Sequence, residues 1–179
     1  MIVTVAQFNT FTGNRETATD IVSMKEQMLK TAQEIVSEYL GYEVENCEHD
    51  DYLSPIGQPT LYLNAYPVTS ILDLSLFGTE IPSSDYAVRG RGLRLNDGVW
   101  PVGNDIVHCR YMAGWTSSTV PSEVLQTITQ IASLLLQEAG GNIGITGKSM
   151  SENSRTYINF TNFKKWLEKL DPLRVVRFV

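Results

Sequence analysis

The hydrophobic period of this sequence changes twice along the chain, and this change constrains the fold more than any single motif. Apolar residues recur at helical spacing from Asp20 to Leu40, and Gly41 provides a natural stop. Helical spacing returns after Pro121, which suits a first helical turn, and Gly140-Gly141 ends it. The pattern between these stretches is different, so the sequence predicts helices on both sides of an insertion.

Short β-type runs fill the segment between the predicted helices. Turn sequences such as Phe77-Gly78-Thr79 and Arg89-Gly90-Arg91-Gly92 separate the runs, and such punctuation is typical of hairpins. The sequence therefore predicts an antiparallel β insertion at about residues 58–113. The stretch Glu43–Asp51 before it is acidic and irregular, and it is predicted to be an exposed loop.

The chain after the second long helix is predicted to contain a flexible loop, a short helix and a tail. The stretch Asn142–Asn159 is rich in Gly, Ser and Asn, which favours a flexible loop. The residues of interest in this loop are Asn142, Ile143, Lys148, Asn153 and Arg155. The last helix carries Phe163, Trp166, Leu167 and Leu170 at helical spacing. Asp171-Pro172 ends it, and an extended tail with alternating residues follows.

These patterns predict an α+β fold, a small bundle of three main helices with an inserted antiparallel β subdomain. The whole chain, residues 1–179, is expected to form a single domain. The helical part is placed at about 15–42 and 118–172, the insertion at about 58–113, and the C-terminal tail at 173–179.

The charge of the chain is negative and unevenly distributed. The net charge of −6 is the wrong sign for a generic DNA binder. Residues 1–60 hold 3 basic and 10 acidic side chains (−7), and the rest hold 11 basic and 10 acidic (+1), which together give −6. One interpretation is a solvated acidic face. The other is a subunit with faces of opposite sign that meet head to tail in a ring.

Several classes of protein are disfavoured by what the sequence lacks. No stretch approaches the roughly 20 continuous apolar residues of a membrane span, and residues 1–11 do not have the pattern of a secretory signal. Cys47 and Cys109 are far apart, which favours free thiols in a reducing compartment over a single disulfide. We therefore expect no membrane association.

Catalytic and cofactor-binding patterns are also missing. His49 and His108 are interpreted as structural, and the cluster Glu45–Asp51 as a solvated acidic stretch in preference to a cation site. The run 140–149 ends in Gly-Lys-Ser but lacks the first glycine, the preceding strand and the following helix of a P-loop. The sequence predicts a protein that is not an enzyme and has no metal or cofactor.

Basic side chains gather in two places along the sequence. The first set is Arg89, Arg91, Arg94 and Arg110, and the second is Lys164, Lys165, Lys169, Arg174 and Arg177. Either set could contact phosphate, but aromatic residues are not interleaved with them as in a single-strand binder. Salt bridges between subunits, or simple solvation, are the favoured interpretations.

The order of these features resembles the head–tail connector family of tailed bacteriophages, also called adaptor or head-completion proteins. The resemblance begins at the helix end Tyr39-Leu40-Gly41-Tyr42 and covers most of the chain beyond about residue 20. Its most characteristic residues are Tyr66, Pro67, Trp100, Pro101, Tyr111, Gly114, Trp115, Asp171 and Pro172. The chain departs from the family after Asp171-Pro172, where Leu173-Arg174-Val175 replaces the usual Tyr-Arg-Arg.

The resemblance implies a structural virion protein that is assembled in the host bacterial cytoplasm. It implies a ring of twelve-fold symmetry under the portal, which extends the DNA channel and joins the head to the tail. The implied partners are other copies of the chain, the portal protein, and the tail or the next head-completion protein. Double-stranded DNA would pass through without sequence recognition, and an acidic lining would repel its phosphates.

Two hypotheses about partner contacts follow, and two rivals stay open. The tail could dock on the portal by adding a strand to an exposed edge, through Arg174, Val175, Val176, Arg177, Phe178 and Val179. The loop 142–159 could become ordered in the ring. The rivals are a tail-completion or tail-terminator protein, and a small carbohydrate- or protein-binding β module. The second rival would use exposed Trp100 and Trp115 as platforms, although core packing or turn-locking explains these tryptophans equally well.

Overall fold

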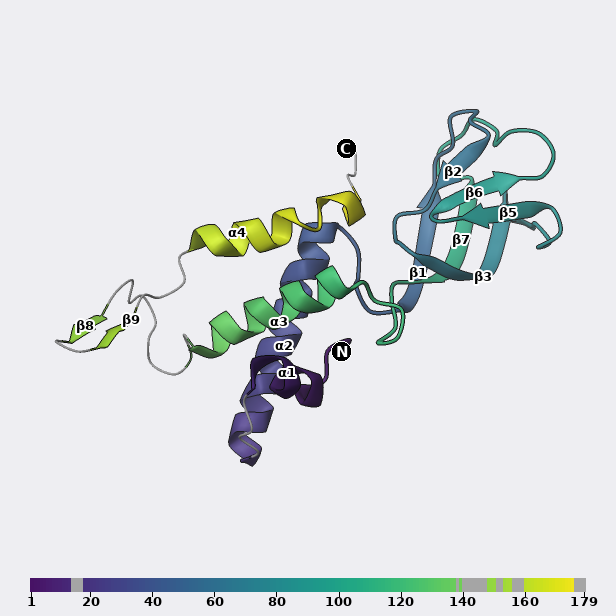
Figure 1. Cartoon of the computed structure of the whole chain (residues 1–179). Coiled ribbons are helices and arrows are strands. Elements are labelled where there is room, and N and C mark those ends of the chain that lie inside the picture. The colour runs from purple at the N-terminus through teal and green to yellow at the C-terminus, as the bar shows by residue number, and fades with distance from the viewer. Residues whose placement is uncertain (14–17, 138, 140–147, 151–152, 156–159, 176–179) are drawn as a thin grey trace. The chain divides into compact units, whose positions relative to one another are not determined.

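The computed structural model describes residues 1–13, 18–137, 139, 148–150, 153–155 and 160–175, and it combines helices with antiparallel sheets (Figure 1). The helices are α1 (Val5–Thr12), α2 (Thr19–Leu40), α3 (Ser122–Gln137) and α4 (Phe160–Glu168), and a 3-10 turn covers Asp171–Leu173. The strands are β1 (Cys47–Leu53), β2 (Thr60–Tyr62), β3 (Val68–Leu76), β4 (Thr79–Glu80), β5 (Tyr86–Arg89), β6 (Gly92–Leu95), β7 (Val107–Ala113), β8 (Lys148–Met150) and β9 (Asn153–Arg155).

The chain forms two compact units. The helical unit contains Met1–Leu40 and Ser117–Arg174, and the β unit contains Gly41–Thr116 and Val175–Val179. The β unit therefore begins earlier than the expected insertion at residue 58, because the stretch after α2 already belongs to its sheet. Within the described residues, no helix is both long and apolar enough to cross a membrane.

The core of the helical unit lies between α2 and α3. Val36 of α2 and Ile128 and Ile131 of α3 are completely buried, as the helical spacing of apolar residues predicted, and Leu29 of α2 is completely buried as well. Helix α4 ends at Glu168, shortly before Asp171-Pro172, and Leu170, which follows the helix in the sequence, is buried. The side chain of Phe163 lies outside the described residues.

Helix α1 is a fourth helix that the periodicity did not predict. Thr4 caps its first turn, because the Gln7 amide donates to the Thr4 hydroxyl while the Gln7 side chain accepts from the Thr4 amide. Gly13, at φ +69°, ends it. Asn9 anchors it on α2, since its Oδ1 accepts a hydrogen bond of 2.8 Å from the buried Lys25. The spacing Thr4-x-x-Gln7 was the available signal, but a helix of 8 residues, about two turns, is too short to show a helical period.

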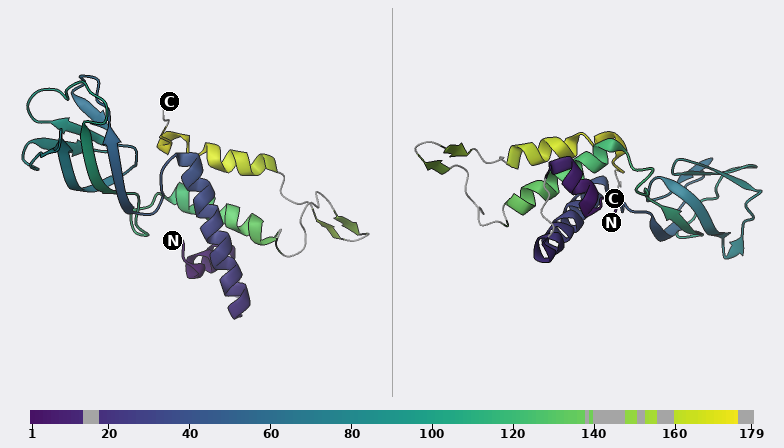
Figure 2. Two further views of the ribbon diagram at one scale, coloured as in Figure 1. Left: turned by 180° about the vertical axis from the view of Figure 1, so that it is seen from behind. Right: turned by 60° about the horizontal axis from the view of Figure 1, so that its bottom comes forward.

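The β unit contains two antiparallel sheets, which overlie one another in the views of Figures 1 and 2. The larger has the order β1-β7-β3-β4, and the smaller has the order β2-β6-β5. Leu61 and Leu93 of the smaller sheet and Leu74 and Tyr111 of the larger are buried. Their buried sides face a common core. Trp100 fills that core, and its indole N–H donates to the Leu93 carbonyl at 2.9 Å.

Two hairpin turns confirm the predicted punctuation. Phe77 and Gly78 both have positive φ between the paired residues Leu76 and Thr79, which is the geometry of a type I′ turn. Gly90 has positive φ at the first position of the loop between Arg89 and Gly92, as in a type II′ turn. These turns set the register of β3-β4 and β5-β6.

Strand β1 corrects the prediction of an exposed loop at Glu43–Asp51. Cys47–Leu53 pairs with β7 along its whole length, from Cys47 opposite Ala113 to Leu53 opposite Val107. Its exposed residues, Glu48, Asp50 and Tyr52, alternate with half-buried ones, and only pairing with β7 reveals the strand. The prediction was wrong because an acidic composition also occurs in a strand that has one side in solvent.

The region expected to be a flexible loop contains a short hairpin. β8 pairs with β9, from Lys148 opposite Arg155 to Met150 opposite Asn153. Three of the loop residues singled out in the sequence, Lys148, Asn153 and Arg155, therefore lie in strands. Asn142 and Ile143 lie outside the described residues.

Candidate interaction surface

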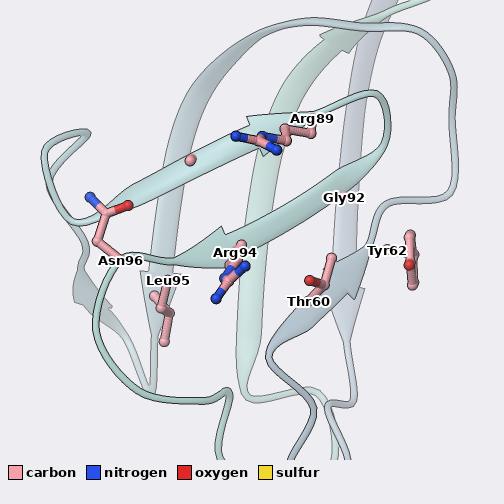
Figure 3. A pocket seen from close by; sticks show the side chains of 8 residues that line it. Thr60, Tyr62, Arg89, Gly92, Arg94, Leu95 and Asn96 are labelled. Carbon is pink, nitrogen blue, oxygen red and sulfur yellow. The ribbon is translucent and has the colours of Figure 1, made fainter.

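The outward side of the smaller sheet carries Arg89 and Arg94 of the first predicted basic set (Figure 3), with Arg91 in the turn between them, whereas Arg110 lies in β7 of the larger sheet. Alternation along the strands turns Leu61, Val88 and Leu93 inward, and it turns Arg89 and Arg94 outward. The outward set, here called the arginine face, is Thr60, Tyr62, Ala87, Arg89, Gly92 and Arg94, together with Arg91 in the β5-β6 turn. The face thus collects charges from two strands and a turn.

The arginine face is hollowed into a shallow depression of about 440 Å³. Gly92 lies in its floor, where a Cβ atom would come within 3.0 Å of Thr60 Cγ2 and 3.2 Å of the Arg89 carbonyl oxygen. A larger residue would therefore fill the space between β2 and β5. The depression has room for a side chain of a partner between the guanidinium groups.

The guanidinium groups on this face are available for a partner. Among the described residues, Arg89 and Arg94 form no ion pair. Arg91 lies over the ring of Tyr62, 5.4 Å from its centroid, and that ring is 59% exposed. A cation–π contact of this kind holds a guanidinium in place without neutralising it. Tyr62 was not among the residues predicted from the sequence to bind a partner, although its position between Leu61 and Leu63 in an alternating run was the signal.

The outward side of the larger sheet has the opposite charge. Glu48 and Asp50 of β1 and Asp73 of β3 point away from the core, on either side of Arg110 and His108 in β7. This set is called the acidic face. Its cross-strand contacts are His108 Nε2 with Asp50 Oδ1 at 2.7 Å and Arg110 with Glu48 at 4.0 Å. Tyr52, 63% exposed, stacks on His108 with 4.6 Å between the ring centroids.

The acidic cluster considered as a cation site is divided between two sides of a strand. Glu48 and Asp50 point outward, whereas His49 and Asp51 point toward the core side of β1. Among the described residues, no group of three His, Cys, Asp or Glu side chains converges to hold a metal ion. Alternation in a strand separates neighbours that a loop would have allowed to converge.

Asp51 belongs to the fold instead. Its carboxylate accepts a hydrogen bond of 2.6 Å from the Tyr111 hydroxyl, and that hydroxyl accepts one of 3.2 Å from the Ala65 amide. Burial and the Asp51 hydrogen bond raise the pKa of Tyr111. The trio ties β1, β7 and the segment before β3 together, so Tyr111 has a structural role here.

The only close Cys–His pair among the described residues lacks the electrostatics of a nucleophile. Cys47 Sγ lies 3.4 Å from His49 Nε2. Burial, followed by the carboxylates of Glu43 and Glu45, raises the pKa of the Cys47 thiol. Reactive cysteines have a lowered pKa, so this pair is poorly suited to nucleophilic catalysis. Cys109 is deeper, and burial raises its pKa to about 12. Both cysteines are free thiols.

Both tryptophans are buried, which fits the core-packing alternative and not the surface platforms that a ligand-binding module would need. Trp100 is 0% exposed and Trp115 is 4% exposed. Trp115 packs with Tyr42 and Tyr66 at centroid distances of 5.8 and 6.1 Å. Large aromatic rings contribute most to the stability of the fold when they are buried away from water, and here both rings are part of the core.

The other residues that carry the family resemblance have structural positions in the β unit or at the end of the helical unit. The Pro67 carbonyl accepts a hydrogen bond of 3.0 Å from Gly114, and Pro101 follows the buried Trp100. Asp171 accepts a hydrogen bond from the Tyr39 hydroxyl, and Pro172 lies in the 3-10 turn. Each of these contacts lies within a single unit.

The start of the predicted docking tail is packed. Arg174 lies over the Tyr39 ring, 5.0 Å from its centroid, and Val175 is 8% exposed. The Val175 carbonyl oxygen lies 2.8 Å from where a Cβ atom of Gly41 would stand. Val176, Arg177, Phe178 and Val179 lie outside the described residues.

Solved structures of gene transfer agent (GTA) particles share this fold over nearly the whole chain. The neck of an empty GTA particle with C6 symmetry matches with a TM-score of 0.65 at 14% identity, covering 99% of this chain and 92% of that one. The neck of a native particle with C12 symmetry gives 0.60 at 14% identity, covering 98% and 90%. A chain of the native GTA virion gives 0.58 at 13% identity, covering 92% and 82%. No protein-family model matches the chain, and no curated protein matches it.

Proposed function

We propose that this chain is a structural protein of the neck of a phage-like particle, where it forms a ring under the portal, extends the DNA channel and joins the head to the tail. The observation that carries the proposal is the fold likeness to GTA neck chains, which extends over 99% of this chain and includes both units. A likeness confined to one unit would fit many functions. A likeness over the helices, the inserted sheets and their order is much more restrictive.

The symmetry of the similar structures supports a ring. The neck chains that share the fold come from assemblies computed with C6 and C12 symmetry. Each subunit of a ring needs two different surfaces that complement each other. The arginine and acidic faces of the β unit provide surfaces of opposite sign. We therefore propose a ring of twelve copies.

The acidic balance of the chain suits a DNA conduit. With a net charge of −6, the surface repels the phosphates of a passing duplex, whereas a basic lining would retain them. The proposed partners are the portal on one side and the tail or the next head-completion protein on the other. The tail from Val176 onward is the proposed portal contact, because Arg174 and Val175 are already packed on the chain itself.

The proposal is tested by adding the purified full-length chain to portal-bearing heads of its own particle and imaging the portal vertex by electron microscopy. We expect added ring density directly beneath the portal. A variant truncated after Val175 should lose this density if the tail is the portal contact, and the full-length chain is its control. Density at a tail end, with none at the portal, would assign the chain to tail completion and contradict the adaptor role. No binding at either place would contradict a neck function.

A further inference from the structure

The arginine and acidic faces look in opposite directions from the same unit. Leu93 and Leu61 in one sheet and Leu74 and Val107 in the other are buried on the sides that share the core. Arg89 and Arg94 therefore leave one side of the β unit, while Glu48 and Asp50 leave the other. A single copy cannot bring these two faces together. Their charges can meet only between copies.

From this arrangement we infer that the arginine face of one copy binds the acidic face of the next, and that this contact closes the ring. The inference rests on the proposed function. It adds the residues that join one subunit to another: Arg89, Arg91 and Arg94 on one side, and Glu48, Asp50 and Asp73 on the other.

The charges on the two faces are complementary. The arginine face holds Arg89, Arg91 and Arg94, and the acidic face holds Glu48, Asp50 and Asp73 against Arg110. Guanidinium groups bind carboxylates with two parallel hydrogen bonds, which fixes orientation as well as attraction. Since Arg89 and Arg94 have no ion-pair partner among the described residues, they lose no existing ion pair when they bind.

Each face also has an exposed aromatic ring beside its charges. Tyr62 is 59% exposed on the arginine face, and Tyr52 is 63% exposed on the acidic face. Tyrosine and arginine are among the residues that most often dominate the binding energy of protein–protein interfaces, and a tyrosine ring can enter a depression such as the one around Gly92. Tyr52 is the residue of the acidic face that is suited to that depression.

A second copy explains the arginine face better than DNA does. Guanidinium groups on a small sheet of three short strands reach only a few phosphates, and binding through so few contacts is weak at physiological salt. The chain itself, by contrast, carries a matching acidic surface. Two unlike faces on opposite sides also give a head-to-tail contact, which generates a ring when the rotation from one copy to the next closes.

The test uses complementary charge reversals in the full-length chain. Variant A is Arg89→Glu/Arg94→Glu, which makes both faces acidic, and variant B is Glu48→Lys/Asp50→Lys, which makes both basic. The control is Lys30→Glu/Lys169→Glu, which changes the net charge as variant A does but at exposed sites on the helical unit. Copy-to-copy association is measured by sedimentation at low salt and high concentration, and as ring density on portal-bearing heads.

We expect variants A and B each to associate with themselves about tenfold or more weakly than the unmodified chain, because like charges then face each other. An equal mixture of A and B should recover association, since the two can alternate around a ring with an even number of subunits. Recovery in the mixture also shows that both variants are folded. The control should associate like the unmodified chain.

The inference is overturned if A and B associate normally, or if their mixture associates no better than each alone. Co-sedimentation with duplex DNA is measured as well. If variant A assembles normally but no longer co-sediments with DNA as the unmodified chain does, the arginine face is a DNA-binding surface instead. These results leave the neck function intact as long as the unmodified chain adds density beneath the portal. If no ring density appears on the portals but association in solution still depends on these charges, the neck function is contradicted and the inferred contact between copies is retained.

Discussion

The helical unit and the β unit are stabilised by different kinds of contact. In the helical unit, α2 and α3 bury aliphatic side chains such as Leu29 and Ile128 against each other. The β unit adds hydrogen bonds from buried polar groups, such as Tyr111 with Asp51, and a backbone crossing at Gly114 where no side chain fits. We therefore expect the stability of the helical unit to depend on the volume that its core side chains fill, and the stability of the β unit to be sensitive to the gain or loss of a single atom.

The largest effect is expected from Gly114→Ala. A Cβ atom there would lie 2.5 Å from the Glu45 carbonyl oxygen, and the residue has φ +107°, which side chains rarely tolerate. Overpacking and backbone strain together should destabilise the protein by about 3 kcal/mol or more. The measurement is unfolding in denaturant. The control is Gly78→Ala, at φ +77° with nothing within 4 Å of the new Cβ. It should cost only about 1–2 kcal/mol. Equal losses would show that the contact with Glu45 is unimportant.

Truncation of Ile128 tests the helical unit in the same way. Ile128→Ala should lower the free energy of unfolding by about 2–5 kcal/mol, because the residue is completely buried and the cavity closes only in part. Ile128→Val removes a single methylene and should cost only about 0.5–1.5 kcal/mol. Denaturant unfolding measures both. A similar loss in the two variants would mean that shape rather than volume governs this core.

Tyr111→Phe removes one oxygen atom from the β unit. The Ala65 amide then loses its acceptor and the Asp51 carboxylate loses its donor, so we expect a loss of about 1–3 kcal/mol. Tyr52→Phe is the matched control, since that ring is 63% exposed and its change should stay within about 0.5 kcal/mol. If both variants unfold at the same denaturant concentration, the buried polar contact contributes nothing measurable.

The smallest expected effect is a loss of stability at alkaline pH. Burial raises the pKa of Cys109 from 9.0 to about 12, so the unfolded chain ionises first. The stabilising contribution is complete below about pH 9 and is lost as the pH rises toward 12. A rise from pH 9 to pH 10 should lower the free energy of unfolding by about 1 kcal/mol. Cys109→Ala should flatten the dependence of unfolding free energy on pH between 9 and 10. An unchanged slope would assign the effect to tyrosines such as Tyr111.

Prediction from the sequence succeeded where structure depends on near neighbours. The spacing of apolar residues in α2 and α3 is a property of a few consecutive turns, and both helices lie where they were expected. The turns at Phe77-Gly78 and Gly90 were equally local. Helix α1 was missed because its 8 residues are too few to show a period, although the cap Thr4-x-x-Gln7 was visible.

Prediction failed where distant segments decide the structure. Nothing within Cys47–Leu53 marks it as a strand, because its acidic side chains favour exposure and only the partner strand β7 orders them. Trp100 and Trp115 could have been surface platforms as far as the sequence shows. Their burial depends on the core that the two sheets build around them.

Local sequence patterns were enough to predict the long helices, the hairpin turns, the presence of antiparallel strands and the unequal distribution of charge along the chain. Where those charges lie on the surface depends on how the strands pair. Arg89 and Arg94, separated by a turn, share one face, and Glu48, Asp50 and Asp73 share the opposite one. The physical reason is that local preference sets the direction of a side chain within its strand, whereas long-range pairing of strands sets the side of the molecule on which it emerges.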